Sequence, residues 1–197
     1  RYYSRSEAFS VATYPAVAEV KSIVDAALAS AAEIGNQPVG SVTADITTAF
    51  NGTARDDRSA ESTLGNLVAD SLLTTLSSAE RGGAEIGVTN PGGLRAELYY
   101  GDDGVITYAE ANAVLPFVNS LWTTTLTGAQ LKTMLEQQWQ PEGSSRAFLA
   151  LGLSDNITYT YDPDQPRGSR IQTVTINGAA MDPSRAYRVG TFSFLAQ

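Results

Sequence analysis

The sequence predicts a mixed α/β fold, in which helices pack against a mixed sheet and the C-terminal third is rich in strands. Over the first two thirds of the 197 residues, helical hydrophobic periodicity alternates with short apolar strand-like runs. The last third changes to strand-like alternation, broken by Pro, Gly and Asn turns. Hydrophobic residues make up 43% of the chain and charged residues 17%, which suits a packed core and argues against global disorder.

The N-terminal part divides into a lead-in and a helix. Residues 1–12 carry no periodicity and are interpreted as a lead-in or linker. A linking helix is expected within residues 13–37, because Pro15 suits a first helical position and Gly35 suits a helix end. The chain starts without Met or a signal peptide, so we expect a processed or excised piece. The predicted helix carries one apolar stripe, made of Val17, Val20, Val24, Leu28 and Ala31.

The middle of the chain predicts short elements joined by polar segments. We expect a turn over 36–40, a strand over 42–46, a polar segment over 51–62, a helix over 63–79 and a strand over 86–88. The predicted second helix has an apolar face formed by Leu64, Leu67, Val68, Leu72 and Leu76.

Two further helices are expected before the strand-rich end. A short helix is expected over 107–114, and a strand over 121–126 leads into a helix whose start is marked by Thr127 and Gln130 as a capping box. The strand-rich end consists of predicted strands at 157–161, 171–176 and 187–189. The segment 38–197 is therefore expected to form one domain.

The segment Asn90-Pro-Gly-Gly-Leu-Arg95, directly after the 86–88 strand, predicts a tight turn beside a bound anion. Its glycines let the backbone approach a ligand closely, and the planar guanidinium of Arg95 suits phosphate or carboxylate. The chain contains no His and no Cys, which excludes disulfides, thiolate nucleophiles and Cys-ligated zinc. The pattern therefore favours a chain that holds a ligand over one that cleaves it alone.

The charge balance limits the classes of partner that this chain is expected to bind. A net charge of −8, from 13 basic and 21 acidic residues, argues against a general nucleic-acid-binding protein. No apolar run approaches the roughly 20 residues needed to span a bilayer. Any phosphate site must be a local group of arginines.

Several residue types together suit a nucleotide. Aromatic rings can stack on a base, side-chain amides can read its edge, and arginines can bind its phosphates. Each residue also has a structural alternative. Arg55 and Arg58 stand among three acidic residues and can form a solvated charge cluster. The two aromatic candidates can be core residues and Asn119 a turn residue; these candidates are Phe117 and Phe194.

Four blocks, in order, resemble the C-terminal domain of bacterial and animal 5′-nucleotidases. The resemblance covers about residues 38–197, and the first helix resembles the stretch that links the two domains of that family. The blocks are Glu61-Ser-Thr-Leu-Gly-Asn-Leu-Val-Ala-Asp70, the segment 90–95, Gly104-Val-Ile-Thr107 with Leu115-Pro-Phe-Val-Asn119, and a last block from Phe148 through Tyr159-Thr-Tyr-Asp162 to Ala186-Tyr-Arg-Val-Gly-Thr-Phe-Ser-Phe-Leu-Ala196.

The resemblance implies a division of labour between two domains. In that family an N-terminal metallophosphoesterase domain holds two divalent metal ions and hydrolyses the substrate, while the C-terminal domain binds the nucleoside and carries it to the metals. No cofactor is expected in this chain, and the two metal ions are expected in an N-terminal domain outside it. The expected partners are a nucleoside or nucleotide and that metallophosphoesterase domain.

The resemblance also assigns roles to single residues. By position, two rings sandwich the base, two amides contact its edge, and two arginines contact the phosphate or ribose end. These are Phe117 and Phe194, Asn90 and Asn119, and Arg58 and Arg95 respectively. Gly93 and Gly152 are expected in the pocket wall, and Arg55 lies one residue away from a further arginine of some members.

This chain departs from the family pattern in three places. Pro91 stands where many members have Gly, and Leu151-Gly152 replaces a Ser-Gly or Gly-Gly pair. The family continues past the last block with a Gly-Gly-Asp-Gly segment whose Asp binds the ribose hydroxyls. That final segment, after Gln197, is expected to be absent here.

Three functions follow as hypotheses. The first is the substrate-recognition domain of a secreted two-metal 5′-nucleotidase, extracellular, cell-wall associated or periplasmic, and inactive on its own. The second is a surface binding or adhesion module that keeps the fold without nucleotide recognition. The third, an independent carboxylate hydrolase, would depend on acids such as Asp70 and Asp102, which are better explained as solvated structural residues.

Overall fold

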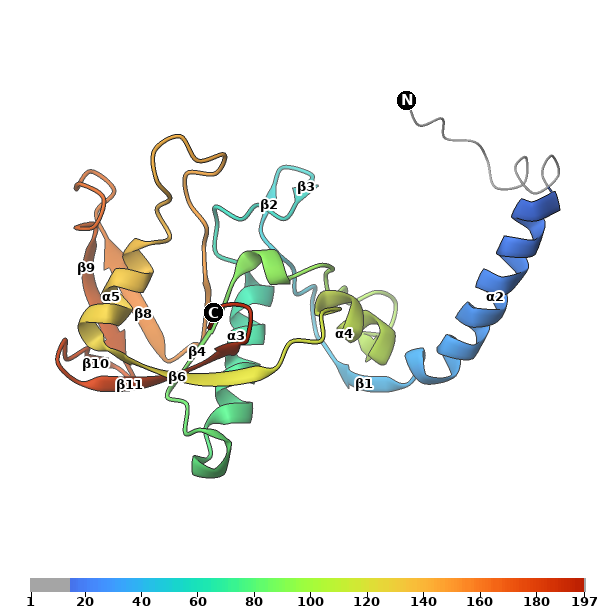
Figure 1. Ribbon diagram of the computed structural model, residues 1–197, viewed down its shortest axis with the longest axis horizontal. Helices are drawn as coiled ribbons and strands as arrows, with labels where there is room; N and C mark the ends of the chain where they lie inside the picture. Colours follow the sequence, from blue (N-terminus) through green and yellow to red (C-terminus); the bar gives the residue numbers. More distant parts are fainter. Residues whose placement is uncertain (1–14, 197) are drawn as a thin grey trace.

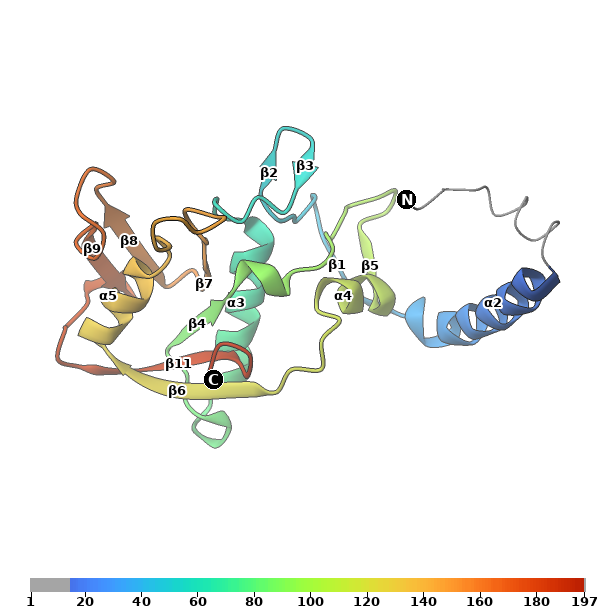
Figure 2. The ribbon, with the colours of Figure 1, turned by 45° about the horizontal axis from the view of Figure 1, so that its top comes forward.

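The computed structural model describes residues 15–196, so the expected lead-in over 1–12 lies outside the described residues. The predicted N-terminal helix is confirmed as α2 (Pro15–Gly35), which projects away from the rest of the molecule in both views (Figures 1 and 2). Its C-terminal end packs on α4 (Tyr108–Val114), where Ala109 approaches Gly35. Most of its apolar stripe is exposed, including Val20 and Leu28.

A four-stranded mixed sheet forms the centre of the fold, as predicted. Its order is β6 (Leu121–Thr127), β11 (Ala186–Phe192), β4 (Ile86–Thr89) and β7 (Gly152–Leu153). Strand β11 pairs antiparallel with β6 and parallel with β4, and β4 pairs antiparallel with β7. Helix α3 (Thr63–Leu76) packs on one face of this sheet (Figure 2).

Glycines let α3 lie directly on the sheet. A Cβ added at Gly87 in β4 would stand 1.9 Å from the carbonyl oxygen of Ala69 in α3. A Cβ added at Gly152 in β7 would stand 2.5 Å from the carbonyl oxygen of Gly65. Real Cβ atoms cannot approach a backbone oxygen this closely, so the helix–sheet spacing requires glycine at both positions.

A second sheet and α5 build the other half of the core. Strands β8 (Ile157–Tyr161), β9 (Ile171–Ile176) and β10 (Ala179–Ala180) form an antiparallel sheet in the order β10-β9-β8. Helix α5 (Gly128–Glu136) starts at the predicted capping box of Thr127 and Gln130. The main hydrophobic cluster joins these elements to the central sheet and includes Ile86, Leu131, Leu135, Ile171 and Val189.

Short elements surround this core. Strand β1 (Pro38–Ser41) pairs with β5 (Val105–Thr107), and β2 (Phe50–Asn51) pairs with β3 (Ala54–Arg55). Two short 3-10 helices follow α3 and β4, namely η1 (Ala79–Arg81) and η2 (Pro91–Gly93). A second cluster under α3 and α4 contains Leu64, Val68, Leu72, Leu94 and Val114.

Three predicted elements are wrong in detail. The expected turn at 36–40 and strand at 42–46 are replaced by β1 at 38–41, because pairing with the distant β5 decides this segment. Of the expected strand, Ile46 forms a single bridge with Leu98. The helix expected to reach residue 79 ends at Leu76, whose carbonyl accepts the N–H of Ala84 and turns the chain toward β4.

We expect Gly87→Ala to reduce the free energy of unfolding by about 3 kcal/mol or more, because the new methyl group would force α3 away from β4. Gly40→Ala is the matched control, since nothing lies within 4 Å of a Cβ at Gly40, and its cost should stay within about 0.5 kcal/mol. Urea unfolding followed by circular dichroism measures both. Equal unfolding midpoints for the two variants would contradict the helix–sheet contact.

Candidate functional site: a cleft beside the central sheet

A cavity of about 1100 Å³ opens on the face of the central sheet that includes Val88 and Val189. Its walls come from the loop after β4, the loop before β6, the end of β11, and α5 with the loop that follows it. Six of the residues singled out from the sequence line this cleft: Arg58, Asn90, Gly93, Phe117, Asn119 and Phe194. Segments far apart in the chain therefore bring together arginine, amide, glycine and aromatic groups.

The loop after β4 forms one wall. Strand β4 is buried along its length, and Asn90 leaves it as the residue before η2, with Pro91 at the first position of that turn. The N–H of Gly93 donates to the carbonyl of Asn90, which closes the turn at 3.2 Å. A Cβ at Gly92 would lie 2.9 Å from an Nη1 atom of Arg58 and 3.3 Å from Nδ2 of Asn90. Glycine at position 92 thus lets both side chains approach the turn.

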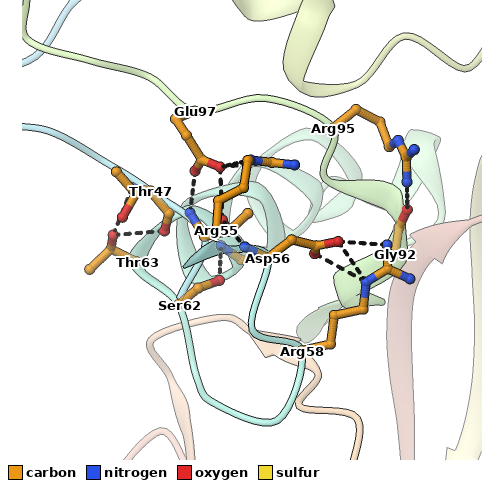
Figure 3. Close-up of polar contacts among 11 residues, drawn as sticks. Thr47, Arg55, Asp56, Arg58, Ser62, Thr63, Gly92, Arg95 and Glu97 are labelled. Atoms are coloured by element: carbon orange, nitrogen blue, oxygen red, sulfur yellow. Dashed lines mark hydrogen bonds and ion pairs between the residues drawn. The ribbon is translucent and has the colours of Figure 1, made fainter. Parts of the chain in front are cut away.

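Arg58 is held by a carboxylate two residues away. Its Nε and Nη2 donate to the two oxygens of Asp56 at 2.8 to 3.0 Å (Figure 3). The backbone of Asp56 is left-handed, with φ of 64°, which turns the carboxylate back toward Arg58. The hydrogen bonds that Arg58 donates to Asp56 raise the pKa of Arg58 above its ordinary value. The sequence left open a solvated charge cluster for these residues. For Asp56 and Arg58, the structure shows a bidentate contact of fixed geometry instead.

Arg95 lies on the opposite side of the turn. Its guanidinium donates to the carbonyl of Gly92 at 3.4 Å (Figure 3). It also lies 6.0 Å from the centre of the Phe117 ring. The side chain is exposed and has no ion-pair partner among residues 15–196. It flanks the cleft without lining it. Its charge stays available to a ligand.

Arg55 does not reach the cleft. Its Nε donates to Glu97 at 2.7 Å and its Nη2 forms an ion pair with the same oxygen. Glu97 is buried and also accepts hydrogen bonds from the backbone N–H and the hydroxyl of Thr48. The candidate Arg55 thus belongs to a structural contact, and the sequence analysis missed Glu97 because its partners lie 42 and 49 residues away.

The two aromatic candidates are on loops and face solvent. Phe117 is 55% exposed and follows α4, and Phe194 is 68% exposed and follows β11. Asn119 donates its backbone N–H to the carbonyl of Phe117, which makes a tight turn at the cleft. The core alternative for these rings is wrong, because neither is buried.

The remaining candidates have structural contacts. Gly152 packs under α3 and does not line the cleft, whereas its neighbour Leu151 does. Asp70 accepts the N–H of Asp155 at 2.8 Å, as a structural residue would. Gln138, which the sequence analysis did not single out, is buried in the cleft wall and accepts the N–H of Leu151. Its position just after a helix did not indicate a buried residue, because glutamine at such a position is usually solvated.

Comparison with known proteins identifies the family. The sequence model of the 5′-nucleotidase C-terminal domain matches residues 38–197. The chain belongs to this family. The resemblance in the four sequence blocks is thereby confirmed, as is the mixed α/β fold.

Relatives of this 5′-nucleotidase C-terminal domain differ in size and description. The trifunctional nucleotide phosphoesterase protein YfkN of Bacillus subtilis is 37% identical over 153 residues, which are 75% of this chain and 10% of that protein. The cell wall protein Lmo0130 of Listeria monocytogenes is 27% identical over 187 residues, 90% of this chain and 23% of that protein. The structure of a 5′-nucleotidase precursor from Thermus thermophilus matches with a TM-score of 0.69 at 28% identity, covering 89% of this chain and 33% of the other.

These relatives place the chain in a hydrolase family, and it spans between a tenth and a third of their lengths. Within residues 15–196, no cluster of His, Cys, Asp or Glu is arranged to hold a metal ion. Across the same residues, none of the helices has the length and apolar character needed to cross a membrane.

We expect Glu97→Ala to lower the free energy of unfolding by about 2 kcal/mol, because the buried N–H and hydroxyl of Thr48 would lose their acceptor. Arg55 is 42% exposed in its side chain and can be solvated, which limits the loss. Glu142→Ala, at an exposed position, should change stability by less than about 0.5 kcal/mol. Equal unfolding curves for the two variants would refute this role of Glu97.

Proposed function

We propose that this chain is the nucleotide-recognition domain of a secreted, two-metal 5′-nucleotidase, and that the metal ions are held by a separate N-terminal metallophosphoesterase domain. The observation that carries the proposal is the convergence of Arg58, Asn90, Phe117, Asn119 and Phe194 on one cleft, with Arg95 at its edge. Their groups complement the phosphate, the base edge and the base face of one nucleotide.

Each wall of the cleft suits one part of the ligand. The exposed rings of Phe117 and Phe194 offer apolar faces that a base can cover, which removes their surface from water. The amides of Asn90 and Asn119 supply donors and acceptors for the base edge. Arg95 supplies an uncompensated positive charge for the phosphate end.

Hydrolysis is assigned to groups outside this chain. Two-metal phosphoesterases use their ions to activate water and to stabilise the attacking and leaving oxygens. Imidazole is a frequent ligand of such ions, and this sequence contains no His. No metal is therefore assigned to the cleft, and the substrate is expected to be presented to a partner domain.

An extracellular, cell-wall or periplasmic location forms part of the proposal. Support comes from a cell wall protein among the relatives and from a structural neighbour described as a precursor. The same cell wall relative favours the alternative, a surface binding module that keeps the fold without nucleotide recognition. Calorimetric titration with adenosine and AMP separates the two, since the alternative predicts no binding of either ligand.

Substitutions of Phe117 and of Arg95 should change the affinities for adenosine and AMP in different ways. Phe117→Ala should weaken the binding of adenosine and of AMP by a similar factor, about 5- to 100-fold. The reason is that stacking on the base contributes about 1–3 kcal/mol to the binding of either ligand. Arg95→Ala should weaken the binding of AMP more than that of adenosine, since its guanidinium is proposed to bind the phosphate of AMP. Calorimetry of both ligands measures this, with Arg146→Ala on an exposed segment as the control. Equal losses for both ligands in Arg95→Ala would rule out the phosphate contact.

The isolated chain should release no phosphate from AMP, with or without added Mn²⁺, Zn²⁺ or Co²⁺, because it has no histidine and no cluster of metal ligands within residues 15–196. A phosphate-release assay on purified protein checks this. Release that follows metal addition and stops with a chelator would place a catalytic centre in this chain.

A further inference from the structure

Three arginines lie near the turn at 90–95, and two of them are already matched by a carboxylate (Figure 3). Arg55 is paired with the buried Glu97, and Arg58 is paired with Asp56. Arg95 has no such partner among the described residues. All three side chains carry a positive charge, but only that of Arg95 is not balanced by a neighbouring carboxylate among the described residues.

The Asp56 contact decides which part of Arg58 faces the cleft. The carboxylate occupies Nε and one N–H of Nη2, which is one of the two edges through which arginine can bind an oxyanion in a bidentate manner. Nη1 remains, directed toward the turn at Gly92. Arg58 can thus still donate hydrogen bonds into the cleft, but its charge is balanced by a carboxylate 2.8 Å away.

Asp56 is itself held in place from the protein interior. Its backbone N–H donates to the hydroxyl oxygen of Thr48 at 3.3 Å, and that hydroxyl donates to Glu97 at 2.8 Å. Asp56 and Arg58 are also largely shielded, with side chains 22% and 19% exposed. The pair is therefore a built feature of the cleft wall, continuous with the buried carboxylate.

We propose that Asp56 is a specificity-determining counter-charge, which restricts Arg58 to the uncharged ribose part of the nucleotide and leaves the anionic phosphate to Arg95. The inference rests on the proposed function and deepens it. A carboxylate at this place repels an anion that approaches Arg58, so the cleft offers one net positive charge at its phosphate end.

The test is Asp56→Asn, because Asn keeps one acceptor oxygen for Arg58 and tolerates the left-handed backbone. We expect AMP to bind about three- to tenfold more tightly to this variant at low ionic strength. The reason is that the variant lacks one negative charge that would repel the phosphate at the edge of the cleft. Adenosine affinity should change by less than about twofold. The gain for AMP should shrink at high salt, since salt screens partly exposed charges.

Asp57→Asn is the matched control, because it removes the same charge one residue away, from a carboxylate that binds Ser59 and not an arginine. An unchanged or weaker AMP affinity in Asp56→Asn overturns the inference, as does an equal shift for adenosine, which indicates a purely structural role. The same gain in Asp57→Asn also overturns it. If the unaltered chain binds neither ligand, the proposed function fails and this inference fails with it.

Discussion

The backbone contact between α3 and strands β4 and β7 fixes the geometry on which the cleft depends. Arg58 lies just before α3, and the loop at Asn90 begins where β4 ends. Because Gly87 and Gly152 let the helix touch the sheet, both segments are held relative to one another. On the opposite face of the sheet, Val88 and Val189 contribute to the cleft, and α5 packs beside them in the main hydrophobic cluster. Recognition groups on loops can therefore act from a rigid frame.

Electrostatics then distinguish groups that look alike in the sequence. Among Arg55, Arg58 and Arg95, neutralisation by neighbouring carboxylates leaves one arginine with its charge free. In the proposed function, this free charge lets a chain with net charge −8 offer a local anion site. In the proposed function it also separates two tasks within one cleft, since a neutralised arginine suits an uncharged sugar and an uncompensated charge suits a phosphate.

Local signals in the sequence were sufficient for elements whose determinants lie close together. The capping box of Thr127 and Gln130 places the start of α5 correctly, because it depends on residues three positions apart. Strand β1 was misplaced because its partner lies more than 60 residues away. The charge pattern alone did not distinguish Arg55 from Arg58, since their contacts depend on Asp56, whose backbone is left-handed, and on the distant Glu97. Periodicity carries no information on such contacts.

The central claim is that one cleft holds a whole nucleotide, with its base between aromatic rings and its phosphate at Arg95. Titration of the isotope-labelled chain with AMP, followed by two-dimensional NMR, tests this most directly. The account predicts saturable shifts at Phe117, Asn119 and Phe194, with further shifts around Arg95 that adenosine does not cause. Saturable shifts confined to another surface, or no saturable shifts with either ligand, would contradict it.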